Sequence, residues 1–146
     1  MGFDEGNGMA DKGFSAEEKL AMKERAKELK AAGKKADFLK DLQAKIAEMP
    51  SDQRTIAQRI HEIVMETAPG LTPKTWYGQP AWADDDGQVV CFFQSAHKFG
   101  TRYSTLGFNE ASKLDDGSMW PTSYAILSLT AADEKTIAAL VTKAVG

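Results

Sequence analysis

Aromatic side chains are concentrated in one block of this chain, and that block constrains the fold more than any other feature. Eight of the thirteen aromatic residues lie between positions 71 and 109. They stand among Gly and Pro residues that favour turns, and they lack the spacing of a helical stripe. We therefore expect a compact antiparallel sheet with large side chains on both faces, forming either core or the wall of a pocket.

The clearest strand is expected over residues 88–94, where both alternating sets of positions are apolar, so that both faces should be covered. The preceding residues 84–87, Asp-Asp-Asp-Gly, are typical of a hairpin turn because Asp-Gly accepts positive φ angles. A loop is expected over 109–119. The other expected strands are 74–77, 80–83, 98–106 and 124–129.

The first helix is expected to be polar. Ser15 and Glu18 match a capping box, and residues 17–32 are rich in Ala, Lys, Glu and Leu, which favour helix. Gly33 suits the position just after the helix. The apolar face is thin, so we expect this helix to be exposed, weakly docked or partly frayed.

Three further helices have clearer apolar faces. They are expected over residues 36–48, over 52–67 with Ser51 as the cap, and from a cap at Thr130 to about residue 145. Helices, then strands, then a helix indicate an α+β fold, with an antiparallel sheet of about five strands flanked by helices. The expected organisation is a flexible leader at 1–13, a polar N-terminal helix at 14–33 and a single α+β domain at 34–146.

Composition narrows the class of protein. With 146 residues and a net charge of −3, the chain suits one domain that is drawn to neither nucleic acid nor an anionic membrane. The single cysteine, Cys91, suits a reducing compartment. We expect a soluble, intracellular, cytoplasmic protein, monomeric or weakly dimeric, whose partner is a small molecule or a protein.

No assembled catalytic site is visible in the sequence. Cys91 is expected in mid-strand as a buried, unreactive thiol, and His61 and His97 as exposed or rim side chains. A nucleophile and base made of Cys91 and His97 is the enzymatic alternative. Because the common hydrolase, nucleotide-binding and zinc-protease motifs are missing from the sequence, we expect no catalytic residues.

Carboxylates are the plausible metal ligands. Asp84, Asp85 and Asp86 are contiguous, and Asp115 and Asp116 repeat the acidic turn before a glycine. Oxygen ligands of this kind suit hard cations and ferrous iron. The alternative is a pair of ordinary solvated turns.

The aromatic block also allows a ligand site. In one interpretation its side chains fill the core. In the other, some of them line a cleft to which Lys74 and Lys98 add polar contacts. The residues assigned to this site are Trp76, Tyr77, Gln79, Trp82, Arg102, Tyr103 and Trp120.

Four motifs resemble one known family. T-P-K-T-W-Y-G-Q-P-A-W at 72–82, V-V-C-F-F-Q-S-A at 89–96, K-F-G-T-R-Y-S-T-L-G-F at 98–108 and L-D-D-G-S-M-W-P-T at 114–122 are similar to the YdhG-like proteins, the domain of unknown function 1801. The resemblance covers the chain from about residue 36 to the end. It implies an α+β fold similar to secretion chaperones, in which the polar first helix is an extension.

Some relatives in that family are described as frataxin-like iron chaperones. The resemblance thus implies Fe(II) delivery as one role, although the helices of this chain mix both charges and lack an acidic ridge. The leading expectation is a non-catalytic ligand-binding or accessory protein. The alternative is an iron-binding and iron-delivery chaperone.

Overall fold

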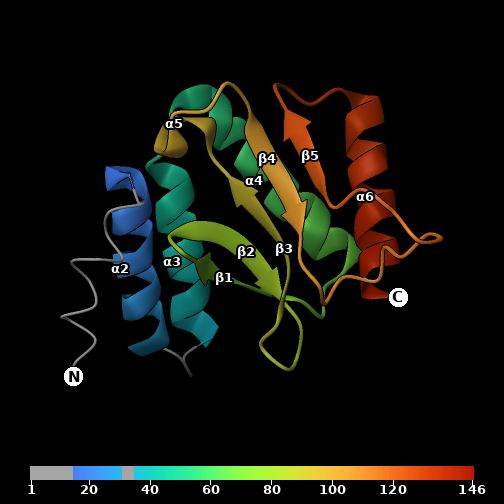
Figure 1. Ribbon diagram of the computed structural model, residues 1–146, viewed down its shortest axis with the longest axis horizontal. Coiled ribbons are helices and arrows are strands. Elements are labelled where there is room, and N and C mark those ends of the chain that lie inside the picture. Colours follow the sequence, from blue (N-terminus) through green and yellow to red (C-terminus); the bar gives the residue numbers. More distant parts are fainter. Residues whose placement is uncertain (1–14, 31–34) are drawn as a thin grey trace.

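The computed structural model describes residues 15–30 and 35–146, and the leader expected at 1–13 lies outside this range. Within the described residues, the chain forms five helices and five strands (Figure 1). In chain order they are α2 (Ala16–Lys30), α3 (Lys35–Ala47), α4 (Ser51–Thr67), β1 (Thr72–Trp76), β2 (Gln79–Ala83), β3 (Val89–Gln94), α5 (Ala96–Phe99), β4 (Ser104–Phe108), β5 (Ser123–Ile126) and α6 (Ala131–Val145).

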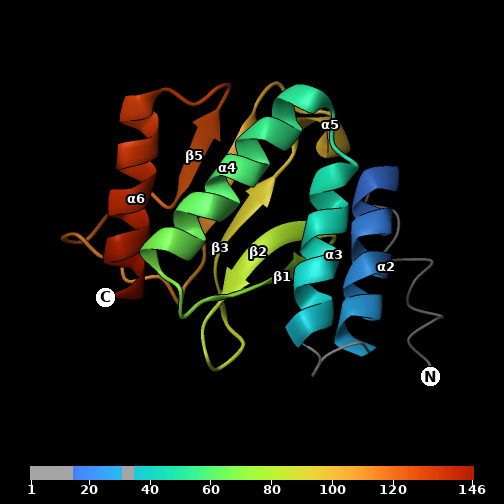
Figure 2. The same ribbon diagram turned by 180° about the vertical axis from the view of Figure 1, so that it is seen from behind.

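The sheet is an antiparallel meander in the order β1-β2-β3-β4-β5, so each strand pairs with its neighbour in the sequence. Helix α4 crosses behind the strands in Figure 1 and in front of them in Figure 2, with α3 on the β1 side and α6 on the β5 side. The α+β class and the flanking helices expected from the sequence are therefore confirmed. None of the helices in the described ranges is long and apolar enough to span a bilayer.

The core fills the space between one face of the sheet and these helices. Trp82 of β2, Phe93 of β3 and Leu106 of β4 are fully buried there, together with Ile60 of α4 and Val141 of α6. Strand positions alternate between faces, so these residues share a face, while Phe92 and Gly107 lie opposite each other on the other face. Strand β3 is apolar on both faces, as expected.

Of the three helix caps expected from the sequence, at Ser15, Ser51 and Thr130, the first and the last are confirmed. Ser15 and Glu18 exchange the two expected hydrogen bonds, of 2.8 and 3.1 Å, and Thr130 does the same with Asp133 at the start of α6. At α4 the expectation was wrong. Pro50 is the N-cap and Ser51 is already helical, because Pro suits the non-helical extended backbone just before a helix.

The strand expected over 98–106 was wrong over residues 98–103, because β4 begins only at Ser104. Residues 96–99 form the short helix α5, which ends at Gly100 with a left-handed φ of 64°. The N–H of Ala96 donates to Oγ of Ser104 over 3.0 Å, so the chain makes a closed turn before β4 begins. Strand β5 is also shorter than expected, since its Ile126 pairs with Ser104, the first residue of β4.

Candidate functional site

The seven residues expected to bind a ligand lie in separate parts of the structure. Trp76, Tyr77 and Gln79 surround the turn between β1 and β2. Arg102 and Tyr103 precede β4, and Trp120 lies half-buried before β5. Trp82 is fully buried in the core, where its indole N–H donates to Nδ1 of His61. The fold therefore divides these residues among two regions and the core position of Trp82, and leaves Trp120 apart as a half-buried side chain packed against the core.

The first region is the aromatic corner, formed by Trp76, Tyr77 and Phe92. The ring centre of Trp76 lies 5.0 Å from that of Tyr77 and 5.2 Å from that of Phe92. The guanidinium of Arg25 in α2 lies 5.6 Å from the Tyr77 ring centre, within the range of a cation–π contact. This corner is a packed group of half-buried rings in contact with α2.

The turn at this corner has an unusual backbone. Tyr77 and Gly78 both have positive φ angles, of 53° and 74°, the combination found in a type I′ hairpin turn. Gln79 follows and is buried, and its Oε1 finds no hydrogen-bond donor in the part of the chain that the structure describes. The corner thus carries a buried polar atom that is available to a further donor.

The second region is the α6–β5 groove, a hollow of about 370 Å³ between strand β5, the segment that follows it, and α6. Its base is apolar, because the buried side chains of Leu106, Ile126 and Ile137 line it. Arg102 and Tyr103 stand at its rim, so two of the expected ligand residues do line a cavity. The remaining lining residues are Tyr124, Ala125, Leu127, Ser128, Leu129, Asp133, Thr136 and Leu140.

The two charged residues of the groove, Asp133 and Arg102, differ in the partners that they already have. Asp133 accepts from the backbone N–H of Thr130, and the hydrogen bonds of this capping box lower the pKa of its carboxyl. The Arg102 guanidinium lies 5.2 Å from the Tyr103 ring centre, and within residues 15–30 and 35–146 it forms no ion pair. Arg102 is therefore the cation at this rim that can still receive an anion.

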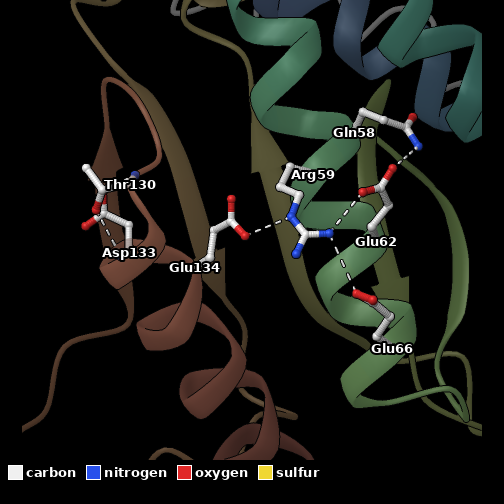
Figure 3. Close-up of polar contacts among 7 residues, drawn as sticks. All are labelled: Gln58, Arg59, Glu62, Glu66, Thr130, Asp133 and Glu134. Atoms are coloured by element: carbon white, nitrogen blue, oxygen red, sulfur yellow. Dashed lines mark hydrogen bonds and ion pairs between the residues drawn. The ribbon is translucent and has the colours of Figure 1, made fainter.

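Ion pairs link α6 to α4 beside the groove (Figure 3). Nε of Arg59 in α4 donates to Glu134 of α6 over 2.9 Å, and its Nη1 lies 3.0 Å from Glu62 and 3.7 Å from Glu66. A single arginine thus joins α4 to the first turn of α6. A second hollow, of about 780 Å³, lies between Arg59 and residues 127–129.

The two acidic turns lie in different connections of the sheet. Oδ1 of Asp84 accepts from the N–H groups of Asp86 and Gln88, over 3.0 and 2.9 Å, which closes the β2–β3 hairpin. Asp115 and Asp116 are exposed in the loop before β5. Across the described chain, no three His, Cys, Asp or Glu side chains come together as a metal site would require.

Cys91 and His97 lie in different environments. Cys91 is fully buried in β3, and burial raises the pKa of its thiol to about 12. His97 is exposed in α5, where its backbone N–H donates to Gln53 over 2.9 Å. A thiol with so high a pKa carries almost no thiolate at neutral pH.

One charged cluster was missed by the sequence analysis. Glu24 of α2 contacts Lys45 of α3 and Lys98 of α5, the last of which was expected only as a polar contact in the aromatic cleft. Glu24 and Lys98 are 74 residues apart in the chain. Because no short-range spacing links them, only the folded structure could bring them together.

Fold and sites together define a class: an α+β domain with a five-stranded meander, an apolar groove beside α6 and a cluster of charged groups beneath α2. Comparison with known proteins adds no family, since no family model, no curated protein and no solved structure matches this chain.

Proposed function

We propose that this chain is a non-catalytic binding protein, and that its α6–β5 groove takes an amphipathic small molecule bearing a carboxylate. The observation that carries the proposal is the combination of a buried apolar base with the cation of Arg102 at the rim, which has no ion-pair partner among the described residues. Ligand pockets commonly have volumes of about 300–1,000 Å³ and a mainly apolar lining with a few polar groups. The groove has these properties.

The two parts of such a ligand have different partners. Its apolar body lies on Leu106 and Ile137, where it removes hydrocarbon surface from water. Its carboxylate lies beside Arg102, whose planar guanidinium can donate two parallel hydrogen bonds. Leu127 is 72% exposed at the edge of the groove and would lose much of that exposure when the ligand binds.

A thermal-shift and calorimetric series tests this proposal. Straight-chain carboxylates from acetate to decanoate should raise the melting temperature increasingly with chain length, and decanol should do so less than decanoate. Arg102→Gln should remove the preference for decanoate over decanol, and Thr136→Trp should block both by filling the groove. Lys135→Gln, an exposed residue of α6 outside the lining, is the matched control. Equal responses of Thr136→Trp and the unmodified protein would exclude the groove as the binding site.

The YdhG-like relationship belongs to the same proposal. Its support is the arrangement of helices around an antiparallel sheet, together with the motifs at 72–82, 89–96, 98–108 and 114–122. A cytoplasmic location also remains our proposal and is supported by the single, buried thiol of Cys91.

A further inference from the structure

A second candidate site lies where α2 meets α3, α5 and the β1–β2 turn, at the opposite end of the sheet from α6 (Figures 1 and 2). At its centre, the carboxylate of Glu24 in α2 forms ion pairs with Lys45 of α3 and with Lys98 of α5, the latter over 2.6 Å. The exposed fractions of these side chains are 14%, 26% and 21%. Two lysines from different elements thus hold one largely buried carboxylate.

The body of the protein positions both lysines without help from α2. Nζ of Lys98 donates to the carbonyl oxygen of Gly78 over 3.0 Å. Nζ of Lys45 lies 3.6 Å from the carboxylate of Glu48, the residue just after the end of α3. Each ammonium group thus has a contact outside α2 that does not involve Glu24.

The backbone of the β1–β2 turn is shaped around this point. A methyl group on Gly78 would overlap both the Glu24 carboxylate and the Lys98 ammonium. The φ angle of Gly78, 74°, also suits glycine. The turn therefore leaves room for an ion pair directly against its main chain, which makes the site a formed cradle.

Helix α2 contacts the rest of the protein at this cradle and through Arg25, which lies over the Tyr77 ring. Among its described side chains, residues 16–25, Ala21 is the buried apolar one, while Leu20 and Met22 are 54% and 43% exposed. A hollow of about 490 Å³ lies between α2 and the body, lined in part by Leu20, Met49 and His97. Over residues 16–25 the helix buries little apolar surface and gains little from packing there, so the ion pairs of Glu24 contribute to holding this part of α2.

We propose that Lys45 and Lys98 form a carboxylate-binding site, that Glu24 of α2 fills it within the chain, and that an acidic side chain on a helix of a partner protein replaces α2 there. Helix α2 supplies the template for that partner, because it shows which chemistry the site accepts. This inference does not depend on the α6–β5 groove.

The energetics favour exchange of one carboxylate for another over loss of the carboxylate. Withdrawal of Glu24 leaves two partly buried ammonium groups without their shared partner, which is costly. Burial acts to raise the pKa of Glu24, but the hydrogen bonds from Lys45 and Lys98 outweigh it and lower the pKa, so the group is ionised at neutral pH. Release of α2 is therefore coupled to the arrival of another anion.

A peptide with the sequence of residues 15–30, labelled with a fluorophore, is the probe. In the full chain, tethered α2 competes at an effective concentration of about 1 mM, so the peptide should bind weakly. Glu24→Gln removes the internal competitor and should tighten binding by about tenfold or more. Adding Lys98→Met to Glu24→Gln should abolish that gain. Glu48→Gln, which removes an exposed carboxylate beside the same Lys45, is the matched control.

Two further binding measurements, one with a variant peptide and one with a free dicarboxylate, identify what the site recognises. A peptide with Gln in place of its Glu24 should not bind the Glu24→Gln chain. Free glutarate at constant ionic strength should displace the labelled peptide only at far higher concentration than unlabelled peptide does. Displacement at equal concentration would overturn the assignment to a helix, since the site would then recognise a small carboxylate.

Hydrogen exchange of the unmodified chain gives an independent test that needs no variant. Saturating peptide should speed exchange of the α2 amides while leaving those of α4 unchanged. The proposal is wrong if α2 exchange does not respond to the peptide, or if Glu24→Gln binds the peptide no better than the unmodified chain.

Discussion

Trp82 donates its indole N–H to Nδ1 of His61 over 3.1 Å, which joins the centre of the sheet to α4. The two rings are stacked, with centres 6.1 Å apart and planes inclined by 24°. Nδ1 can accept this hydrogen bond only while it carries no proton, so the neutral imidazole with its proton on Nε2 is required. The contact therefore depends on pH.

Stability should fall as His61 is protonated. Burial lowers the pKa of His61 below its ordinary 6.5, although the nearby Glu62 opposes this effect. Since the unfolded chain binds the proton more readily, the contribution of neutral His61 is complete above pH 6.5 and is lost as the pH falls through the folded-state pKa. Urea unfolding between pH 8 and pH 5 measures this loss.

The variant His61→Leu tests whether the hydrogen bond between His61 and Trp82 is the source of this pH dependence. It leaves the buried N–H of Trp82 without its acceptor, which should cost about 1–3 kcal/mol at pH 8. The difference from the unmodified protein should shrink as the pH falls below 6.5. A constant difference across this range would show that His61 has no such coupling.

Glu24 should stabilise the fold in a different pH window. Because its pKa is lowered in the folded state, its contribution is present above the ordinary value of 4.5 and is lost as the pH falls through the folded-state pKa. Unfolding of Glu24→Gln should therefore differ from that of the unmodified chain at pH 7, and the difference should shrink as the pH falls below 4.5. Glu48→Gln should show a smaller difference, because Glu48 is 66% exposed.

Gly107 should not tolerate a side chain. A methyl group at this position would overlap the Phe92 ring on the neighbouring strand, so Gly107→Ala should destabilise the fold by about 1–3 kcal/mol in urea unfolding. Phe92→Leu combined with Gly107→Ala should recover part of the loss. Gly70→Ala is the control, since nothing lies within 4 Å of the added group. Additive effects of the two substitutions would mean that the ring is not the obstacle.

Cys91 should react only when the fold opens. Its thiol is fully buried with a pKa of about 12, so labelling by a thiol-specific disulfide reagent should be slow in buffer and fast in denaturant. Rapid labelling of the native protein at pH 7 would restore the Cys91–His97 enzyme hypothesis. His97→Ala should not change the labelling rate.

The iron-delivery prediction has its own measurement. If it holds, an anaerobic Fe(II) titration should show binding tighter than millimolar that is weakened when Asp84, Asp85, Asp86, Asp115 and Asp116 are replaced by Asn. These replacements keep a side-chain oxygen that can accept the turn hydrogen bonds of Asp84. Binding that is absent, or unchanged in the variants, would remove iron delivery from the candidate roles.

The periodic elements were predictable because their signals are local. The apolar spacing of residues 52–67 and the Thr130 cap predicted α4 and α6 almost to the residue. Residues 96–104 were not predictable in this way. Their path depends on the contact between Ala96 and Ser104 and on the conformation of Gly100, which the alternation of polar and apolar residues does not reveal.

The sites were less predictable than the elements. Arg102 and Tyr103 were singled out for their chemistry, and both line the groove. The opposite wall includes Leu127, which follows β5, and Leu140 of α6. Both come later in the sequence than the β4–β5 connection, and no sequence motif marks them as part of a site. The sequence assigned Trp82 to the ligand site with core packing as the alternative, because its pairing register, which turns its side chain toward α4, is a property of the assembled sheet.

The meander has a consequence for biosynthesis. Every strand pairs with the strand made just before or after it, so the sheet can form as the chain leaves the ribosome. The contact of α4 with α6 joins Arg59 to Glu134, so it can form only after α6 has been synthesised. Until then, the apolar surface beneath α6 is exposed to water. A stop before residue 131 would leave a paired sheet with an uncovered core, which is a substrate for chaperones or aggregation.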